Sequence, residues 1–303
     1  MNSPLSTRCF AGRSPGPHLL VTGGVHGDEF EPVVAIRRLI DMLDHEPGLA
    51  ATLRGRVTLV PVVNEPAFRL GSRVAEDGLD LARTCPGRPD GSVTERTAWA
   101  LAALIRTADL YIDLHTGGTR LDVLPLAGYM LHPDRAVLET QRRMARAFGL
   151  PIVWGTTARL EGRSLSVARD AGVPAIYAEY RGAATCRAEG VAAYVAGCLA
   201  VMAACGLLER PIAEAGPVHE FEDERPDSGN LQICHPAPTA GCFLPCVGLG
   251  ARVRAGDRLG SVFDPLEATE ARISADRPGL VLVLRSFPQV EARESLGVIL
   301  ETG

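Results

Sequence analysis

The sequence predicts an α/β protein with a mostly parallel, twisted sheet, helices on both faces, and a small C-terminal all-β domain. Up to about residue 205, apolar runs of strand length alternate with segments of helical spacing, as in a parallel sheet covered on both sides. After Leu208, a proline- and charge-rich connector leads into short apolar pieces separated by glycine, which is typical of a β domain. We therefore expect a first domain over residues 1–210 and a second over residues 217–303.

The first elements follow from periodicity. Residues 19–23 form an apolar run that predicts a buried strand, and apolar residues at helical spacing predict a helix over residues 32–43. Residues 56–64 predict the next strand. A glycine-, proline- and charge-rich loop then covers residues 64–91, and its length favours a functional role over a mere connection.

The alternation continues through the rest of the first domain. Ser92 and Glu95 are spaced as a capping box, which predicts a helix that continues through Ile105. The later elements are expected as strands at residues 109–115, 123–127, 152–154 and 174–180, and as helices at residues 134–148 and 188–205.

Composition favours a protein that acts on a small molecule. With 303 residues, 46% hydrophobic, 22% charged and a mean hydropathy of +0.09, the chain can bury a large core. A net charge of −5 gives no general attraction to nucleic acid or to an anionic membrane. Neither a secretory signal nor an apolar run of roughly 18 residues is present, so a cytoplasmic protein is expected. The 8 cysteines contain no C-x-x-C pair, so they do not indicate a thiolate zinc site.

All 31 basic residues are arginine, and the sequence has no lysine. Schiff-base chemistry and a Walker-type phosphate loop both need a lysine amine, so both are excluded. The C-terminal pattern GxRVxxGDxLGxV followed by PGxVL resembles a barrel-sandwich hybrid of the biotinyl/lipoyl type. Without lysine this domain cannot carry such a cofactor, and we expect it to be structural or to shape the active site.

Four residues suited to metal chemistry stand at strand ends. His26 and Glu29 follow the first strand, His115 ends the strand YIDLH, and Glu179 ends the strand AIYAE. Ligands of open α/β sheets gather at the carboxyl ends of the strands. Two imidazoles and one carboxylate make a three-ligand zinc set with an open position for water, and a further carboxylate nearby can act as general base and acid.

Each residue alone is weak evidence, because a single histidine at a strand end is more often structural. The joint placement favours a site, together with two glycine-rich turns, GGVHG and HTGG, that allow the backbone to approach a ligand closely. Asp113 lies two residues before His115, on the same face of the strand, where it can orient that imidazole.

These motifs resemble the succinylglutamate desuccinylase/aspartoacylase family, a branch of the zinc carboxypeptidase clan. GGVHGDE is similar to the first metal motif of the family and DLHTGG to the second, and NEPAFRLGSRVAEDGLDLARTCPGR is similar to its N-P-x-A, arginine and D-L-N-R-x-F-P-G segment. The resemblance covers roughly residues 17–205, and the β-rich tail also looks like the C-terminal domain of the family. It implies a zinc carboxypeptidase-like fold with one zinc ion per chain.

The resemblance also implies roles for individual residues. His26, Glu29 and His115 would bind the zinc, and Glu179 would move the proton between water and the leaving amine. Arg73 would stabilise the oxyanion, while Arg83 and Asn64 would bind the substrate, with Arg83 gripping a carboxylate. With so many arginines, a surface ion pair remains the alternative for Arg73 and Arg83.

The chain departs from the family pattern at three positions. Ala82 replaces the asparagine of D-L-N-R, which helps to hold the substrate carboxylate, Cys85 stands where phenylalanine is common, and Glu65 separates Asn64 from the proline. None of these positions is an expected metal ligand. Without this asparagine, it is in doubt that the site recognises a substrate by a standard amino-acid carboxylate.

The sequence therefore predicts a metal-dependent amidohydrolase, a zinc deacylase that cleaves a small N-acyl amino acid or related N-acyl amine. Similarity to a subgroup suggests an acetylated diamino acid. A zinc carboxypeptidase acting on short peptides, an esterase, and a non-catalytic small-molecule binding protein on the same scaffold stay open as alternatives. A nucleic-acid or membrane partner is not expected, and the sequence leaves a homo-oligomer open.

Overall fold

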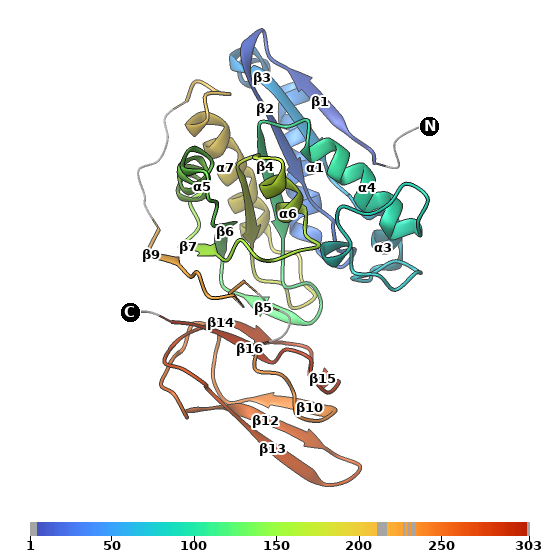
Figure 1. Cartoon of the computed structure of the whole chain (residues 1–303), viewed down its shortest axis with the longest axis vertical. Helices are drawn as coiled ribbons and strands as arrows, with labels where there is room; N and C mark the ends of the chain where they lie inside the picture. The colour runs from blue at the N-terminus through green and yellow to red at the C-terminus, as the bar shows by residue number, and fades with distance from the viewer. Residues whose placement is uncertain (1–4, 211–216, 227, 230, 232–233, 302–303) are drawn as a thin grey trace. The chain divides into compact units, whose positions relative to one another are not determined.

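The computed structural model describes residues 5–210, 217–226, 228–229, 231 and 234–301, and the chain forms two compact units (Figure 1). Unit 1 comprises Met1–Thr116, Pro125–Tyr180 and Cys186–Ser228. Unit 2 comprises Gly117–Leu124, Arg181–Thr185 and Gly229–Gly303. Besides the C-terminal segment, unit 2 therefore takes in two short segments from within residues 1–210, so the chain passes between the units several times.

An eight-stranded sheet in the order β1-β3-β2-β4-β8-β6-β7-β9 is the framework of unit 1. The strands are β1 (Arg8–Ala11), β2 (Ser14–Thr22), β3 (Arg54–Val60), β4 (Leu110–His115), β6 (Leu126–Met130), β7 (Ile152–Thr156), β8 (Ala175–Glu179) and β9 (His219–Glu222). Five neighbouring pairs run parallel, whereas β1 with β3 and β6 with β8 run antiparallel. The predicted mostly parallel sheet is confirmed, with β6, β7 and β9 reversed relative to β2, β3, β4 and β8.

Helices cover both faces of this sheet, as predicted (Figure 1). They are α1 (Phe30–His45), α2 (Pro47–Thr52), α3 (Glu65–Leu70), the 3-10 helix η1 (Leu81–Arg83), α4 (Val93–Ile105), α5 (Arg135–Phe148), α6 (Ser164–Asp170) and α7 (Ala188–Ala204). Because side chains alternate along a strand, Leu19 and Val21 of β2 pack in a core with α1, α5 and α7, while Leu20 packs in a core with α4 and α6. None of the helices in the described ranges has the length and apolar composition that a membrane span requires.

Local sequence signals explain where the structure agrees with the predicted elements and where it differs from them. Ser92 and Glu95 make both hydrogen bonds of the capping box at the start of α4. The strand expected over residues 56–64 ends at Val60, and the following loop contains α3 and η1. The run expected at residues 123–127 divides into β5 (Leu121–Val123) and β6, because Pro125 between them has no N–H for a strand ladder.

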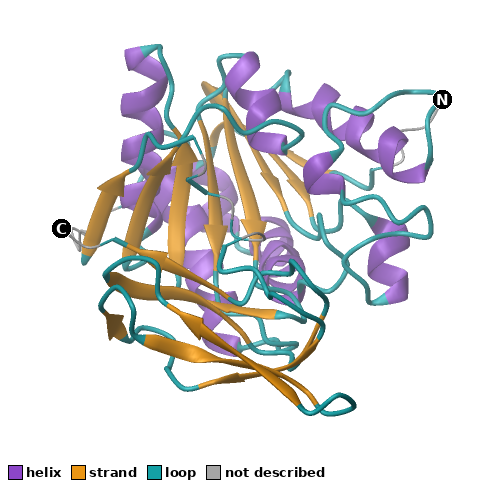
Figure 2. Ribbon diagram, turned by 60° about the horizontal axis from the view of Figure 1, so that its bottom comes forward, coloured by secondary structure: helices purple, strands orange, loops and turns teal. Residues whose placement is uncertain are grey.

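Unit 2 is all β within its described residues, in agreement with the predicted C-terminal β domain (Figure 2). One sheet has the order β13-β12-β10-β15, and the other has the order β11-β14-β16 with β5 added beside β14. The strands are β10 (Gly241–Pro245), β11 (Arg252–Val253), β12 (Arg258–Asp264), β13 (Thr269–Ser274), β14 (Gly279–Arg285), β15 (Gln289–Val290) and β16 (Gly297–Leu300). Both sheets contribute to one apolar core that includes Phe243, Val262 and Val281.

Candidate active site

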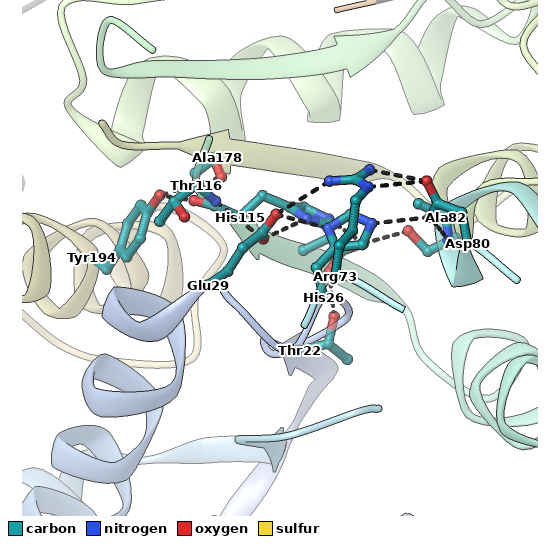
Figure 3. A network of polar contacts seen from close by, with 12 residues as sticks. Thr22, His26, Glu29, Arg73, Asp80, Ala82, His115, Thr116, Ala178 and Tyr194 are labelled. Carbon is teal, nitrogen blue, oxygen red and sulfur yellow. Dashed lines mark hydrogen bonds and ion pairs between the residues drawn. The ribbon is translucent and has the colours of Figure 1, made fainter. Parts of the chain in front are cut away.

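Three side chains that can bind a metal meet at one edge of the unit 1 sheet (Figure 3). His26 comes shortly after β2, Glu29 is the N-cap residue of α1, and His115 is the last residue of β4. β2 and β4 are adjacent and parallel, so their carboxyl ends lie at the same edge. One ligand atom from each of the three residues lies within 4.8 Å of the others. The structure thus brings together the three residues that the sequence predicted as metal ligands.

The turn between β2 and α1 requires two of its glycines. Gly24 has a φ of 61°, in the left-handed region that glycine adopts most easily. A Cβ atom on Gly27 would lie 2.1 Å from the backbone carbon and oxygen of Ala67 in α3. The α3 backbone therefore packs directly against the residue that follows His26.

The Glu29 carboxylate lies between the two imidazoles and is only 1% exposed. Its Oε1 is 2.7 Å from His26 Nδ1, and its Oε2 is 3.1 Å from His115 Nδ1. The backbone N–H of Thr116 also donates to Oε2, at 3.1 Å. Glu29 stands at the N-terminus of α1, where the helix dipole favours a negative charge.

A second carboxylate faces the other nitrogen of each imidazole. His26 Nε2 lies 3.1 Å from Asp80 Oδ1, and His115 Nε2 lies 3.1 Å from Asp113 Oδ2. The contact that the sequence indicated between Asp113 and His115 is therefore present. Sequence reasoning missed the role of Asp80, although Asp80 begins the D-L-A-R motif. Both rings are thus held so that Nδ1 points at Glu29.

Asp113 is itself fixed by hydroxyl groups on both sides. Thr22 Oγ1 donates a hydrogen bond of 2.7 Å to Oδ1, and the Ser164 hydroxyl donates to Oδ2. Because the Thr22 proton is used in this way, the Tyr111 hydroxyl donates to Thr22 Oγ1, at 2.8 Å. Asp113 is 1% exposed, and these donors explain how a charged group is tolerated there.

Arg73 connects Asp80 to the centre of the site. Its Nε and Nη2 donate to Asp80 Oδ2 at 3.2 and 3.0 Å, and its Nη1 lies 3.9 Å from Glu29 Oε1. Asp80 also accepts a hydrogen bond from the Ala82 N–H at 2.9 Å. Arg73 therefore has one guanidinium nitrogen directed toward the group of predicted metal ligands.

The charges around the imidazoles favour a cation. Burial alone lowers the pKa of His26 and of His115, but the adjoining carboxylates outweigh burial and raise both. Burial raises the pKa of Glu29, yet the two imidazoles outweigh it and hold that pKa well below its usual range. Two imidazoles and a carboxylate form a donor set that zinc commonly uses. The residues present therefore fit such an ion.

Glu179 stands beside His115. It is the last residue of β8 and is paired in register with His115 on β4. Its Oε2 is buried and has no hydrogen-bond partner among the residues that the structure describes. Burial raises the pKa of Glu179 to about 7, Glu29 acts in the same direction, and His115 opposes the shift. A carboxyl group that titrates near neutrality is suited to general acid–base chemistry.

Arg83 and Asn64, the two residues predicted to bind substrate, lie in different surroundings. Arg83 is exposed, and its Nη1 donates to the Ala82 carbonyl at 2.7 Å. Asn64 is fully buried at the N-cap of α3, where its Oδ1 accepts from the Ala67 N–H at 3.3 Å. Within the described part of the chain, its Nδ2 has no hydrogen-bond partner. The described hydrogen bond of the Asn64 side chain is thus that of a helix cap.

Arg163, to which sequence reasoning assigned no role, is near enough to Arg83 for the two charges to interact. It is half-buried at the N-cap of α6, and burial together with the Arg83 guanidinium lowers its pKa to about 10. An anion close to Arg163 and Arg83 would therefore stabilise the charge of Arg163. The available signal was the pair Gly162-Arg163 ahead of the short helix that begins at Ser164, in a segment where no element was expected.

Comparisons with known proteins found a family profile and relatives that match most of the chain. The family profile described as the succinylglutamate desuccinylase/aspartoacylase catalytic domain matches residues 15–205. The chain is 33% identical, over 299 residues, to an enzyme from Halomonas elongata named N-alpha-acetyl-L-2,4-diaminobutyric acid deacetylase, covering 95% of this chain and 83% of the relative. It is 30% identical over 187 residues to a succinylglutamate desuccinylase from Burkholderia cenocepacia, covering 56% of this chain and 48% of that protein.

Solved structures are similar over nearly the whole chain. The product-bound structure of the ectoine utilization protein EutE (DoeB) from Ruegeria pomeroyi has a TM-score of 0.85 at 28% identity, covering 97% of this chain and 87% of that one. A succinylglutamate desuccinylase/aspartoacylase from Rhodobacter sphaeroides has a TM-score of 0.83 at 26% identity, covering 97% and 88%.

Proposed function

The chain belongs to the succinylglutamate desuccinylase/aspartoacylase family, and we propose that it hydrolyses the amide bond of a small N-acyl amino acid. Support comes from the cluster of His26, Glu29 and His115 beside Glu179, whose Oε2 atom is buried. The relative from Halomonas elongata deacetylates an acetylated diamino acid. We therefore take N-α-acetyl-2,4-diaminobutyrate as the first candidate substrate.

We propose that His26, Glu29 and His115 bind one zinc ion per chain through the two Nδ1 atoms and the Glu29 carboxylate. A zinc ion there supplies Lewis acidity and lowers the pKa of a water molecule to about 7. Asp80 and Asp113 accept from the Nε2–H groups, which keeps Nδ1 of each ring available.

The catalytic carboxylate in this proposal is Glu179. It takes a proton from the attacking water and returns it to the nitrogen of the leaving amine. Its elevated pKa suits both transfers, because the group accepts and releases a proton near neutral pH. Arg73 Nη1 donates to the oxyanion that forms on the substrate carbonyl, while Asp80 holds the other side of the guanidinium.

The arginines bind the carboxylate of the substrate. Arg83 and Arg163 supply two guanidinium groups, each with a planar set of donors that matches a carboxylate. Ala82 has no side-chain amide to share this task, so Arg163 is the second donor in the proposal. Loss of charge at either arginine is expected to raise KM more than it lowers kcat.

Amine release from a panel of substrates tests the proposed function. The panel contains N-α-acetyl-2,4-diaminobutyrate, N-acetylaspartate, N-succinylglutamate and a dipeptide, with zinc-loaded protein and a Glu179→Gln variant as the blank. We expect the acetylated diamino acid to be cleaved above the blank and the activity to stop with a chelator. Preferential cleavage of the dipeptide would indicate a carboxypeptidase, and no cleavage with bound zinc would indicate a binding protein.

A further inference from the structure

Tyr177 shares a face of β8 with the catalytic carboxylate. Side chains alternate along a strand, so Tyr177 and Glu179 lie on one face and Ile176 and Ala178 on the other. The cores agree with this alternation, since Ile176 and Ala178 pack with α1, α5 and α7, and Tyr177 packs against the core of α4 and α6. Tyr177 therefore lies two residues before Glu179, on the face of the sheet that carries the site.

At the position of Tyr177, paired residues form a row across the three strands β4, β8 and β6. Asp113 of β4 is in register with Tyr177 of β8, and Tyr177 is opposite Gly128 of β6. Asp113 is the residue that faces His115 Nε2, so the row begins at the predicted metal site. It ends at a glycine, which leaves room for a large side chain from the neighbouring strand.

The phenol ring of Tyr177 fills that room. A Cβ atom on Gly128 would lie 2.3 Å from Cζ and 2.5 Å from the hydroxyl oxygen of Tyr177. The ring therefore lies across β6 and not toward Asp113. Tyr177 is half-buried, whereas the sheet residues Tyr111 and Tyr129 are fully buried. Of these three tyrosines, Tyr177 is thus the one that keeps some solvent exposure.

Charged groups of the site adjoin the ring. Both Glu179 and Arg163 interact electrostatically with the Tyr177 hydroxyl, Glu179 raising and Arg163 lowering its pKa, in addition to the larger effect of burial. Tyr177 therefore stands near the carboxylate that moves the proton and near an arginine proposed to bind substrate. The amino-acid half of a substrate held by Arg163 would meet this ring.

We propose that Tyr177 determines which amino acids the site accepts, by limiting the length of the amino-acid side chain in the N-acyl substrate. The inference rests on the proposed deacylase function and extends it to the specificity of the same site. Misfit of one methylene in a pocket changes kcat/KM by roughly 10-fold or more. The acyl half of the substrate lies on the other side of the scissile bond, so Tyr177 does not select the acyl group.

Two substrate series test the amino-acid half and the acyl half of the substrate separately. The first varies the amino acid in methylene steps at a constant acetyl group: N-α-acetyl derivatives of 2,4-diaminobutyrate, ornithine and lysine. The second varies the acyl group on 2,4-diaminobutyrate: acetyl, propionyl and butyryl. kcat/KM is measured for both series with zinc-loaded wild type, Tyr177→Val and Tyr177→Phe, and with Tyr129→Phe as the control. Tyr129 neighbours Gly128 in β6, and its hydroxyl donates to Glu222 at 2.6 Å, outside the proposed site.

The proposal predicts a selective change. Tyr177→Val should raise the kcat/KM ratio of the lysine derivative to the diaminobutyrate derivative by at least roughly 10-fold and leave the acyl series unchanged. Tyr177→Phe keeps the ring, so neither series should change in selectivity. Broadening of the acyl series, or an unchanged amino-acid series, would overturn the proposal.

Gly128→Ala gives a second test that does not require removing the ring. The added Cβ displaces the Tyr177 ring from β6, so this variant should lose activity on the diaminobutyrate derivative. The loss should disappear when Gly128→Ala is combined with Tyr177→Val, because the clashing group is gone. Equal losses in both backgrounds would contradict the inference. Failure of wild type to cleave any member would instead refute the proposed function, and the inference with it.

Discussion

Each histidine of the site has a carboxylate at both ring nitrogens. Glu29 faces Nδ1 of both rings, while Asp80 and Asp113 face the two Nε2 atoms. This arrangement fixes the orientation of each ring and makes the imidazole nitrogen that faces Glu29 a better metal ligand. At the scale of residues, the outer aspartates should therefore matter for metal affinity even though they are not proposed as ligands.

Replacing Asp80 tests this role. Asp80→Ala removes the acceptor for His26 Nε2 and one partner of Arg73, so zinc affinity should fall by about 10- to 100-fold. Competition with a chromophoric chelator measures the Kd. Asp90→Ala is the matched control, because Asp90 is an exposed aspartate of the same segment. Equal zinc affinity in Asp80→Ala and Asp90→Ala would contradict the assigned role.

Glu179 should make the stability of the metal-free protein depend on pH. Its folded-state pKa of about 7 lies above the usual value of 4.5, so the folded state binds this proton more tightly than the unfolded state. Stability contributed by the protonated group is present below pH 4.5 and is lost as the pH rises through 7. Relative to Glu179→Gln, chelated wild type should thus become less stable from pH 4.5 to 7 and then level off. Urea unfolding at four pH values measures this difference, and a constant difference would rule out the elevated pKa.

At the scale of elements, the segment between α3 and α4 carries Arg73, Asp80 and Arg83. Asp77 anchors this segment to the start of α4. Its carboxylate accepts hydrogen bonds from the Ser92 hydroxyl at 2.5 Å, the Thr94 N–H at 2.9 Å and the Thr94 hydroxyl at 2.8 Å. An irregular segment that bears charged site residues is thereby tied to a stable helix.

Asp77→Ala should loosen this segment. The Thr94 N–H and hydroxyl belong to a fully buried residue, so loss of their acceptor should cost about 1–3 kcal/mol of unfolding free energy. KM should rise as well, because Arg83 is on the freed segment. Urea unfolding and steady-state kinetics measure both effects. Ser92→Ala serves as the comparison, since it breaks the α4 capping box but leaves both Thr94 bonds, and it should change KM less. The reverse order would argue against an anchoring role.

At the scale of the whole molecule, the chain passes from unit 1 to unit 2 directly after two site segments. Thr116 follows His115 and precedes Gly117 of unit 2, and Tyr180 follows Glu179 and precedes Arg181 of unit 2. Within unit 2 these two segments hydrogen-bond to each other, with Arg181 N–H donating to the Val123 carbonyl at 2.9 Å. Truncation at the connector near residue 210 would therefore leave parts of unit 2 behind.

The features that could be predicted from the sequence are those that depend on local signals. The strand before His26, the capping box at Ser92 and the alternation of strands and helices all follow from residues close together in the chain. Four polar residues at strand ends could be placed at one edge because parallel strands share that edge. Asp80, Arg163 and Tyr177 owe the roles proposed for them to partners in distant elements, and no local pattern encodes the packing that brings them together.

A zinc titration of metal-free protein tests the central claim most directly. Amine release from N-α-acetyl-2,4-diaminobutyrate is recorded as zinc is added to chelator-treated wild type and to His115→Ala. The proposed His26, Glu29 and His115 site predicts a rise that stops at one equivalent of zinc per chain in wild type, and no rise in His115→Ala. Full amine release before zinc is added, or release that zinc does not change, would contradict a metal-dependent deacylase at this site.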